Sequence, residues 1–237
     1  MTEDTNDNPP SDADSTAFST IEAKMRDVGL SAAAIASFRA NYAALCRNET
    51  GLIPEALIET TDDLPLADSL QASPNAQSLL SKTVVIKLNG GLGTGMGLEK
   101  AKSLLKVKGD NAFLDFIAQQ ILFLRGNTGS TLRFLLMNSF STSTDTLAYL
   151  SDRYPELGEE VDFLQHRVPK IDAATLQPVS MAGNPDLEWC PPGHGDIYAA
   201  LAGSGWLARL LDAGVRYAFV SNSDNLGATL DLGLLEY

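Results

Sequence analysis

The sequence has few of the residues that build disulfide frameworks, histidine metal sites, membrane spans and nucleic-acid surfaces. Its two cysteines, Cys46 and Cys190, lie far apart and indicate no disulfide framework, and two histidines are too few for a multi-histidine metal site. No apolar run approaches the ~20 residues that a membrane-spanning helix needs. Lysine and arginine number 17 against 30 acidic residues, and the formal charge of −13 argues against a nucleic-acid partner. The N-terminus lacks the basic and apolar regions of a secretory signal, so we expect a cytoplasmic protein.

Composition and periodicity divide the chain into three stretches. Residues 1–16 are polar and acidic without apolar periodicity, which predicts a disordered tail. Residues 17–81 predict a helical N-terminal extension, in which two helices break near Gly29, Ser31 caps the second helix, and an irregular connection follows. Residues 82–237 alternate buried β-branched runs with helical periodicity, which predicts an α/β domain with a mostly parallel sheet and helices on both faces. The expected strands are 83–88, 132–137, 161–164 and 217–221, and the expected helices are 113–124, 143–154 and 195–213.

Three of these expected strands end in polar or glycine clusters. The clusters are Asn89-Gly90-Gly91, Asn138-Ser139 and Asn222-Ser223-Asp224-Asn225. In open α/β sheets, ligands bind beyond the carboxyl ends of the strands. The sequence therefore predicts that the three clusters share one edge of one sheet and form a binding site there.

The first cluster opens a loop with five glycines between residues 88 and 97. Glycines let the backbone approach a ligand closely, and successive amides can bind an anion. The spacing matches neither G-x-G-x-x-G nor the Walker A pattern G-x-x-x-x-G-K-[ST]. Lys100, Lys102 and Lys106 follow at short spacing. They are either phosphate ligands or a solvated basic face, and the residues alone leave both open.

Longer motifs resolve this question through a family resemblance. The run Leu-Asn-Gly-Gly-Leu-Gly-Thr-Gly-Met-Gly from residue 88, with Lys-Ser-Leu-Leu from residue 102, resembles UTP–glucose-1-phosphate uridylyltransferases. Gly95 stands where related nucleotidyltransferases have arginine, which favours the UTP–glucose branch, whereas Ala101 stands where the family has proline. Trp-Cys-Pro-Pro-Gly-His-Gly-Asp-Ile-Tyr from residue 189 is the most specific match. The resemblance implies a Rossmann-like, GT-A-like nucleotidyltransferase fold.

The resemblance also implies roles for particular residues. Lys102 is the expected catalytic residue, because it neutralises phosphate charge, and Asp224 is the expected Mg²⁺ ligand. We expect Asp196 to cap a helix rather than bind substrate. The expected nucleotide-binding residues are Leu88, Asn89, Gly90, Gly91, Lys102, Gln165, Gly193 and Asp224. The expected substrate-binding residues are Gly90, Gly91, His194, Asn222, Ser223 and Asp224.

The activity implied by the resemblance is formation of UDP-glucose and pyrophosphate from UTP and glucose 1-phosphate, by Mg²⁺-assisted displacement at the α-phosphate. Family members are longer, so we expect the catalytic domain to continue past Tyr237. One alternative is a noncatalytic UTP-binding fragment. Another is a related UDP-sugar or UDP-N-acetylhexosamine pyrophosphorylase. Neither nucleic acid nor a membrane is an expected partner, and the oligomeric state stays open.

Overall fold

The computed structural model describes residues 12–91 and 101–237, and it divides into two compact units. One unit combines Met1–Glu59 with His166–Ala199, and the other combines Thr60–Gln165 with Ala200–Tyr237. Residues 166–199 pack with the N-terminal helices in the first unit. None of the helices in the described part of the chain is long and apolar enough to cross a membrane.

The second unit is built on a four-stranded sheet in the order β5-β4-β1-β8. Its strands are β1 (Thr83–Asn89), β4 (Arg133–Asn138), β5 (Asp162–Leu164) and β8 (Tyr217–Asn222), and each neighbouring pair is parallel. The register pairs Asn89 with Asn138 and Leu88 with Asn222. The predicted parallel sheet is therefore confirmed, and three strands end together at one edge.

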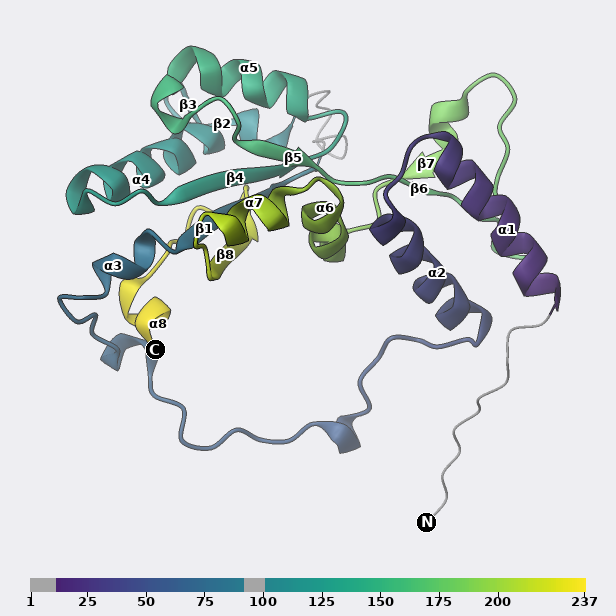
Figure 1. Ribbon diagram of the computed structural model, residues 1–237, viewed down its shortest axis with the longest axis horizontal. Coiled ribbons are helices and arrows are strands. Elements are labelled where there is room, and N and C mark those ends of the chain that lie inside the picture. Colours follow the sequence, from purple (N-terminus) through teal and green to yellow (C-terminus); the bar gives the residue numbers. More distant parts are fainter. Residues whose placement is uncertain (1–11, 92–100) are drawn as a thin grey trace. The chain divides into compact units, whose positions relative to one another are not determined.

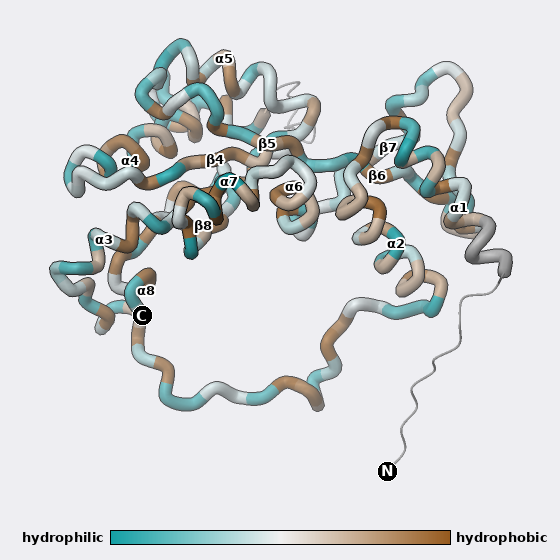
Figure 2. The backbone as a smooth tube through the Cα atoms, in the orientation of Figure 1, coloured by the Kyte–Doolittle hydropathy of each residue, from teal (hydrophilic) through white to brown (hydrophobic). Residues whose placement is uncertain are grey.

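Helices cover both faces of this sheet (Figure 1). Helices α4 (Phe113–Thr128) and α5 (Ser143–Arg153) lie over one face, and α7 (Trp206–Asp212) lies on the other. The Trp206 indole donates a hydrogen bond to the Asp162 carbonyl of β5 at 3.0 Å. Hydrophobic residues run along β4 in Figure 2. The core between the sheet and α4 and α5 includes Val85, Leu114, Ile117, Ala118, Ile121, Phe134, Leu136 and Leu150.

A buried carboxylate joins the helices of that layer. Asp115 on α4 has no exposed area and accepts hydrogen bonds from the Ala112 N–H, the Tyr149 hydroxyl and the Tyr154 hydroxyl at 2.6, 2.6 and 2.7 Å. Burial by itself would raise the pKa of this carboxyl, but the hydrogen bonds outweigh burial and hold the pKa below its usual value. Burial and the bond to Asp115 raise the pKa of Tyr149 to about 12.

Two expectations about the α/β domain of residues 82–237 were wrong. The single helix predicted for residues 195–213 is broken into the 3₁₀ turn η7 (His194–Asp196), α6 (Ile197–Gly203) and α7, because Gly205 takes a positive φ of 80° before α7 begins. Strand β8 forms as predicted but is not buried, since Tyr217 and Val220 are 44% and 42% exposed. Its position at the end of the strand order explains this exposure.

The remaining elements of the second unit are short. Strands β2 (Lys106–Lys108) and β3 (Asn111–Ala112) form an antiparallel pair. The helical turns are η2 (Ala67–Ser69), α3 (Gln77–Leu80), η4 (Lys102–Leu104), η5 (Pro155–Leu157) and α8 (Leu232–Glu236).

The first unit contains the two predicted N-terminal helices, α1 (Asp12–Asp27) and α2 (Ala32–Cys46). Gly29 has a φ of 74°, and the Ser31 side chain accepts a hydrogen bond from the Ala34 N–H at 3.1 Å. The break and the Ser31 cap are thus confirmed. Helix α1 begins at Asp12, inside the stretch of residues 1–16 that was expected to be a disordered tail. The rest of that tail, residues 1–11, lies outside the described residues.

Residues 166–199 complete the first unit through contacts with these helices. Lys24 forms an ion pair with Glu188 and donates to the Val179 carbonyl at 3.0 Å, while the Tyr42 hydroxyl donates to the Leu176 carbonyl at 3.1 Å. Strands β6 (Val168–Pro169) and β7 (Trp189–Cys190) pair antiparallel, and the unit also contains η1 (Glu55–Leu57) and η6 (Pro185–Glu188). Its buried cluster consists of Ala17, Phe18, Ile21, Met25, Ile35 and Tyr42.

Candidate nucleotide-binding site

The three predicted strand-end clusters do share one edge of the sheet. Because β1, β4 and β8 are parallel and in register, their carboxyl ends at Asn89, Asn138 and Asn222 lie together. That arrangement is the usual location of a ligand site in an open α/β sheet. The structure confirms the placement of the clusters, and the contacts around them show how each residue is held.

Side-chain amides at this edge form a buried network. Asn89 Nδ2 donates to Asn138 Oδ1 at 2.7 Å and to Thr146 Oγ1 at 3.1 Å. Asn138 Nδ2 then donates to Asp162 Oδ2 at 2.8 Å, and the Ser143 hydroxyl donates to the same oxygen at 2.7 Å. The Asn89 side-chain amide is therefore hydrogen-bonded within the protein. Sequence reasoning did not identify Thr146 or Asp162 as partners, since they lie far along the chain.

Gly90 and Gln165 are brought into close contact. A Cβ atom added at Gly90 would lie 2.5 Å from Gln165 Oε1 and 3.7 Å from the Ser139 Cβ. The Gln165 backbone N–H donates to the Asn138 carbonyl at 2.7 Å, and the residue is 4% exposed. A side chain at residue 90 would therefore displace the Gln165 amide, and this amide offers both a donor and an acceptor at the end of β1.

Lys102 lies beside the start of the glycine loop. Its backbone N–H donates to the Gly91 carbonyl at 3.3 Å, and its Cδ is 4.0 Å from where a Gly91 Cβ would be. By contrast, Lys106 forms an ion pair with Asp110 at 2.7 Å and is exposed. The structure therefore separates Lys102, next to the strand end, from a lysine on a solvated face. The glycine loop beyond Gly91 and Lys100 fall in residues 92–100, outside the described residues.

The third cluster forms the turn after β8. The Ser223 N–H donates to the Leu88 carbonyl at 3.1 Å, and the Asn225 N–H donates to the Asn222 carbonyl at 3.3 Å. Ser223 is buried, whereas Asn222 and Asp224 are exposed. Asp224 thus presents a carboxylate at the same sheet edge as Gly90 and Lys102.

Within the described residues, no group of three or more histidine, cysteine, aspartate or glutamate side chains could hold a metal ion. A closed protein cage for a metal is therefore absent from residues 12–91 and 101–237. Asp224 offers a single carboxylate. One protein carboxylate is enough for a Mg²⁺ ion that takes its other ligands from water and substrate phosphates. Among the described residues, Asp224 fits that kind of magnesium site.

Gly193 and His194 belong to the first unit. Gly193 has a φ of 94°, a conformation that favours glycine, and it precedes η7, where His194 is exposed. Asp196 directly precedes α6, where the helix cap was expected, and its carboxylate accepts from the His166 N–H at 2.7 Å and lies 3.0 Å from His166 Nδ1. The Ser31 hydroxyl lies 3.1 Å from His166 Nε2. These contacts fix the turn that carries His194, and no local sequence signal marks His166 as their centre.

Comparison with known families identifies the chain's relatives. A family model described as UTP–glucose-1-phosphate uridylyltransferase matches residues 35–237. The chain belongs to the UTP–glucose-1-phosphate uridylyltransferase family. It is 41% identical over 174 residues to the Solanum tuberosum enzyme of that name, and 41% identical over 178 residues to the Saccharomyces cerevisiae enzyme.

Solved structures give the same family. The chain matches a variant of Leishmania major UDP-glucose pyrophosphorylase in complex with UDP-glucose, with a TM-score of 0.86 and 50% identity over 93% of the chain. A Trypanosoma brucei UDP-glucose phosphorylase matches with a TM-score of 0.83 and 45% identity over 94% of the chain. The expected nucleotidyltransferase fold is confirmed. The match to the potato enzyme spans 73% of this chain but 36% of that enzyme, and the Leishmania match spans 46% of the Leishmania chain.

The uridylyltransferase family resemblance also bears on Ala101, which stands where the family has proline. Ala101 has a φ of −54° and a ψ of 136° and is buried. A proline ring fixes φ at about −65°, so the alanine keeps the backbone course that proline imposes. The backbone thus enters η4 at Lys102 with a φ at Ala101 that a proline could also adopt.

Proposed function

We propose that this chain binds UTP and supplies the nucleotide side of uridylyl transfer, in which UTP and glucose 1-phosphate give UDP-glucose and pyrophosphate. The observation that carries the proposal is the contact between Gly90 and Gln165 at the sheet edge, with Lys102 beside Gly91, in a chain of the uridylyltransferase family. A buried amide beside a glycine-bearing strand end supports recognition of a base, and a lysine next to it supports recognition of phosphates.

The reaction is an in-line displacement at the α-phosphorus of UTP. A phosphate oxygen of glucose 1-phosphate forms a bond to that phosphorus, and the bond from phosphorus to the bridging oxygen of pyrophosphate breaks. The attacking oxygen is already anionic near neutral pH, so no general base is required. Catalysis then depends on positioning the reactants and neutralising their charge.

Each residue of the edge has a role in this proposal. The backbone of Leu88, Asn89, Gly90 and Gly91 holds the nucleotide, and Gln165 reads the uracil. Lys102 offsets negative charge on the triphosphate and in the transition state, while Asn222 and Ser223 contribute to the substrate side. The assignments of Gly193 to the base and of His194 to the sugar phosphate stay predictions from the resemblance.

Asp224 is the residue proposed to hold a divalent cation. A Mg²⁺ ion bound there would neutralise charge on phosphate oxygens. The exposure of Asp224 at the shared edge supports this assignment, because an exposed carboxylate leaves space for water and nucleotide ligands. Metal binding should therefore depend on the nucleotide.

The alternative is UTP binding without turnover. The match spans only 36% of the potato enzyme, which supports this alternative. The family resemblance implies that the part of the enzyme outside the match carries a second phosphate-binding lysine and most of the sugar pocket. A related pyrophosphorylase with another UDP-sugar product would share the same nucleotide edge. We also propose the cytoplasm as the compartment.

Thermal denaturation of the chain with nucleotides tests the proposal. We expect UTP with Mg²⁺ to stabilise the chain by ~2.7 kcal/mol relative to the ligand-free state at a hundredfold excess over the Kd. ATP and GTP at the same concentration should stabilise it less. Asp224→Ala should remove the magnesium increment, and Asp152→Ala, an exposed aspartate on α5, should keep it.

Two outcomes decide between the alternatives. Formation of UDP-glucose by the chain supports turnover, whereas stabilisation by UTP without product supports binding alone. Absence of stabilisation by millimolar UTP and Mg²⁺ contradicts both.

A further inference from the structure

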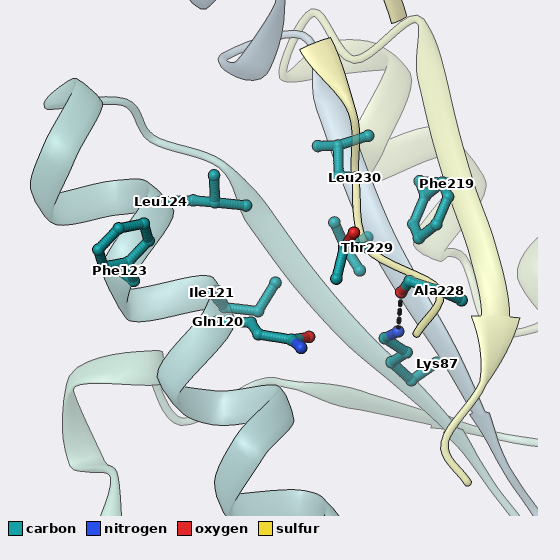
Figure 3. A pocket seen from close by; sticks show the side chains of 10 residues that line it. Lys87, Gln120, Ile121, Phe123, Leu124, Phe219, Ala228, Thr229 and Leu230 are labelled. Carbon is teal, nitrogen blue, oxygen red and sulfur yellow. Dashed lines mark hydrogen bonds between the residues drawn. The ribbon is translucent and has the colours of Figure 1, made fainter. Parts of the chain in front are cut away.

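Lys87 is a charged residue in the middle of a buried strand. It lies on β1 and is 2% exposed (Figure 3). A cavity of about 220 Å³ adjoins it, and the lining residues are mainly apolar, among them Val85, Ile121, Phe123, Leu124, Phe219 and Leu230. Burial lowers the pKa of the Lys87 ammonium. Because burying a charge is costly unless it is well bonded, an apolar side chain would suit this position better if packing were its only role.

The partners of Lys87 lie at the two ends of one loop. Its Nζ donates to the Ser221 hydroxyl at 2.7 Å and to the Ala228 carbonyl at 2.9 Å, and the second bond is drawn in Figure 3. Ser221 belongs to β8, and Ala228 closes the turn that follows it. Between them lie residues 222–227, here called the Asp224 loop. The Lys87 ammonium on β1 thus hydrogen-bonds to the residues on both sides of the Asp224 loop, Ser221 before it and Ala228 after it.

Two further contacts hold the Asp224 loop from the same unit. The Ser223 N–H donates to the Leu88 carbonyl at 3.1 Å, and Gln120 Nε2 on α4 donates to the Leu226 carbonyl at 3.3 Å. The Asp224 side chain itself is exposed. The loop is therefore fixed at its ends and middle by hydrogen bonds, and its carboxylate projects from this framework.

We propose that Lys87 is a positioning residue, which fixes the Asp224 loop so that the Asp224 carboxylate stands ready for a nucleotide-bound divalent cation. The proposal rests on the function proposed above, because it concerns the same carboxylate. Residues that orient a metal ligand without touching the metal commonly change metal affinity by ~10–100-fold when they are altered. Lys87 acts on Asp224 through the backbone of the loop, at both ends.

The test compares Lys87→Met with Ile86→Val. Methionine keeps the length of the side chain and removes the ammonium, whereas Ile86 is the neighbouring residue on β1, is fully buried, and points to the opposite face of the sheet. For each variant, melting temperature is measured without ligand, with UTP alone, and with UTP across a magnesium titration. We expect Lys87→Met to raise the magnesium concentration at half-saturation by ~10-fold or more, with the stabilisation by UTP alone retained. Ile86→Val should lower the ligand-free melting temperature and leave the magnesium titration unchanged.

A second variant covers the case in which Lys87→Met fails to fold. Ser221→Ala removes one acceptor of the ammonium and leaves the bond to Ala228. We expect it to shift the magnesium titration by about two- to tenfold, as the loss of one hydrogen bond implies.

The outcomes separate this inference from the proposed function. If the unaltered chain shows no magnesium increment with UTP, the metal assignment to Asp224 fails and the role of Lys87 fails with it. If the unaltered chain shows the increment and both Lys87→Met and Ser221→Ala titrate as it does, the role of Lys87 is overturned and the proposed function stands. A melting temperature lowered without ligand, together with an unchanged magnesium titration, also overturns the positioning role.

Discussion

Replacing Gly90 by alanine tests whether Gln165 serves the nucleotide base. The added Cβ would lie 2.5 Å from Gln165 Oε1, and ordinary contact begins near 3.4 Å, so the amide oxygen must retreat by about 0.9 Å. Gly90 is not among the residues with a positive φ, so alanine is compatible with its backbone. The perturbation therefore acts on the Gln165 side chain and not on the course of the chain.

The size of the effect follows from this displacement. A hydrogen bond of ~2.9 Å from Gln165 to a base would stretch to about 3.8 Å, beyond the ~3.2 Å at which such bonds normally end. Leaving a buried polar group unsatisfied costs ~1–3 kcal/mol. The Kd for UTP should thus rise by roughly 5- to 150-fold, and the preference for UTP over ATP should shrink with it.

Calorimetric titration with UTP and ATP measures both quantities. A double-variant cycle identifies the route of the effect, because Gly90→Ala should change little in a chain that already carries Gln165→Ala. Gly126→Ala on α4 is the matched glycine control, since nothing lies within 4 Å of its added Cβ. An unchanged affinity for UTP in Gly90→Ala, or an undiminished effect of that change in the Gln165→Ala background, would refute the reasoning.

Two other predictions concern Lys102 and Asp115. Lys102→Ala should weaken UTP binding by ~1.5–3 kcal/mol, as expected for the loss of a hydrogen bond to a charged group. Lys106→Ala breaks an exposed ion pair with Asp110 and should have almost no effect in the same titration. Equal affinities of the two variants for UTP would contradict the assignment of Lys102. Tyr149→Phe should lower the free energy of unfolding in urea by ~1.5–3 kcal/mol at pH 7, because the hydroxyl donates to the Asp115 carboxylate. The folded pKa of Asp115 lies below its ordinary value of 3.8, so this stabilisation is present above pH 3.8 and is lost as the pH falls through the folded pKa. A difference from the unaltered chain that stays constant down to pH 2, as expected for the exposed control Tyr217→Phe, would count against the Asp115 bond.

Local patterns were sufficient to predict the sheet and the edge at which the strand-end clusters meet. Short β-branched runs predicted β1 and β4 to within a residue, and the polar residues that end them predicted the edge at which they meet. Parallel strands in register bring those ends together whatever the length of the helices between them. This is why the amino-acid sequence alone was enough to group Asn89, Asn138 and Asn222.

Burial and hydrogen-bond partners could not be predicted in the same way. Strand β8 has the composition of an interior strand, but its exposure depends on its place in the strand order, which periodicity does not contain. The same holds for the Asp196 carboxylate, which accepts a hydrogen bond from the His166 N–H, thirty residues away. A local motif indicates which hydrogen-bonding groups a residue carries. Its actual partner depends on the tertiary fold, because that partner can lie far away in the sequence.

Lys87 shows how a violation of a local pattern can carry information. The run Thr-Val-Val-Ile-Lys-Leu predicts a strand buried on both faces, and a lysine in such a strand contradicts that prediction unless the fold supplies oxygen acceptors. The structure supplies two, on Ser221 and Ala228, at the ends of the loop that carries Asp224. Sequences usually agree with their fold at every level, and departures concentrate where function imposes a further requirement. A charged residue inside an otherwise apolar strand therefore directs attention to the loop that it holds, here the loop proposed to carry the metal ligand.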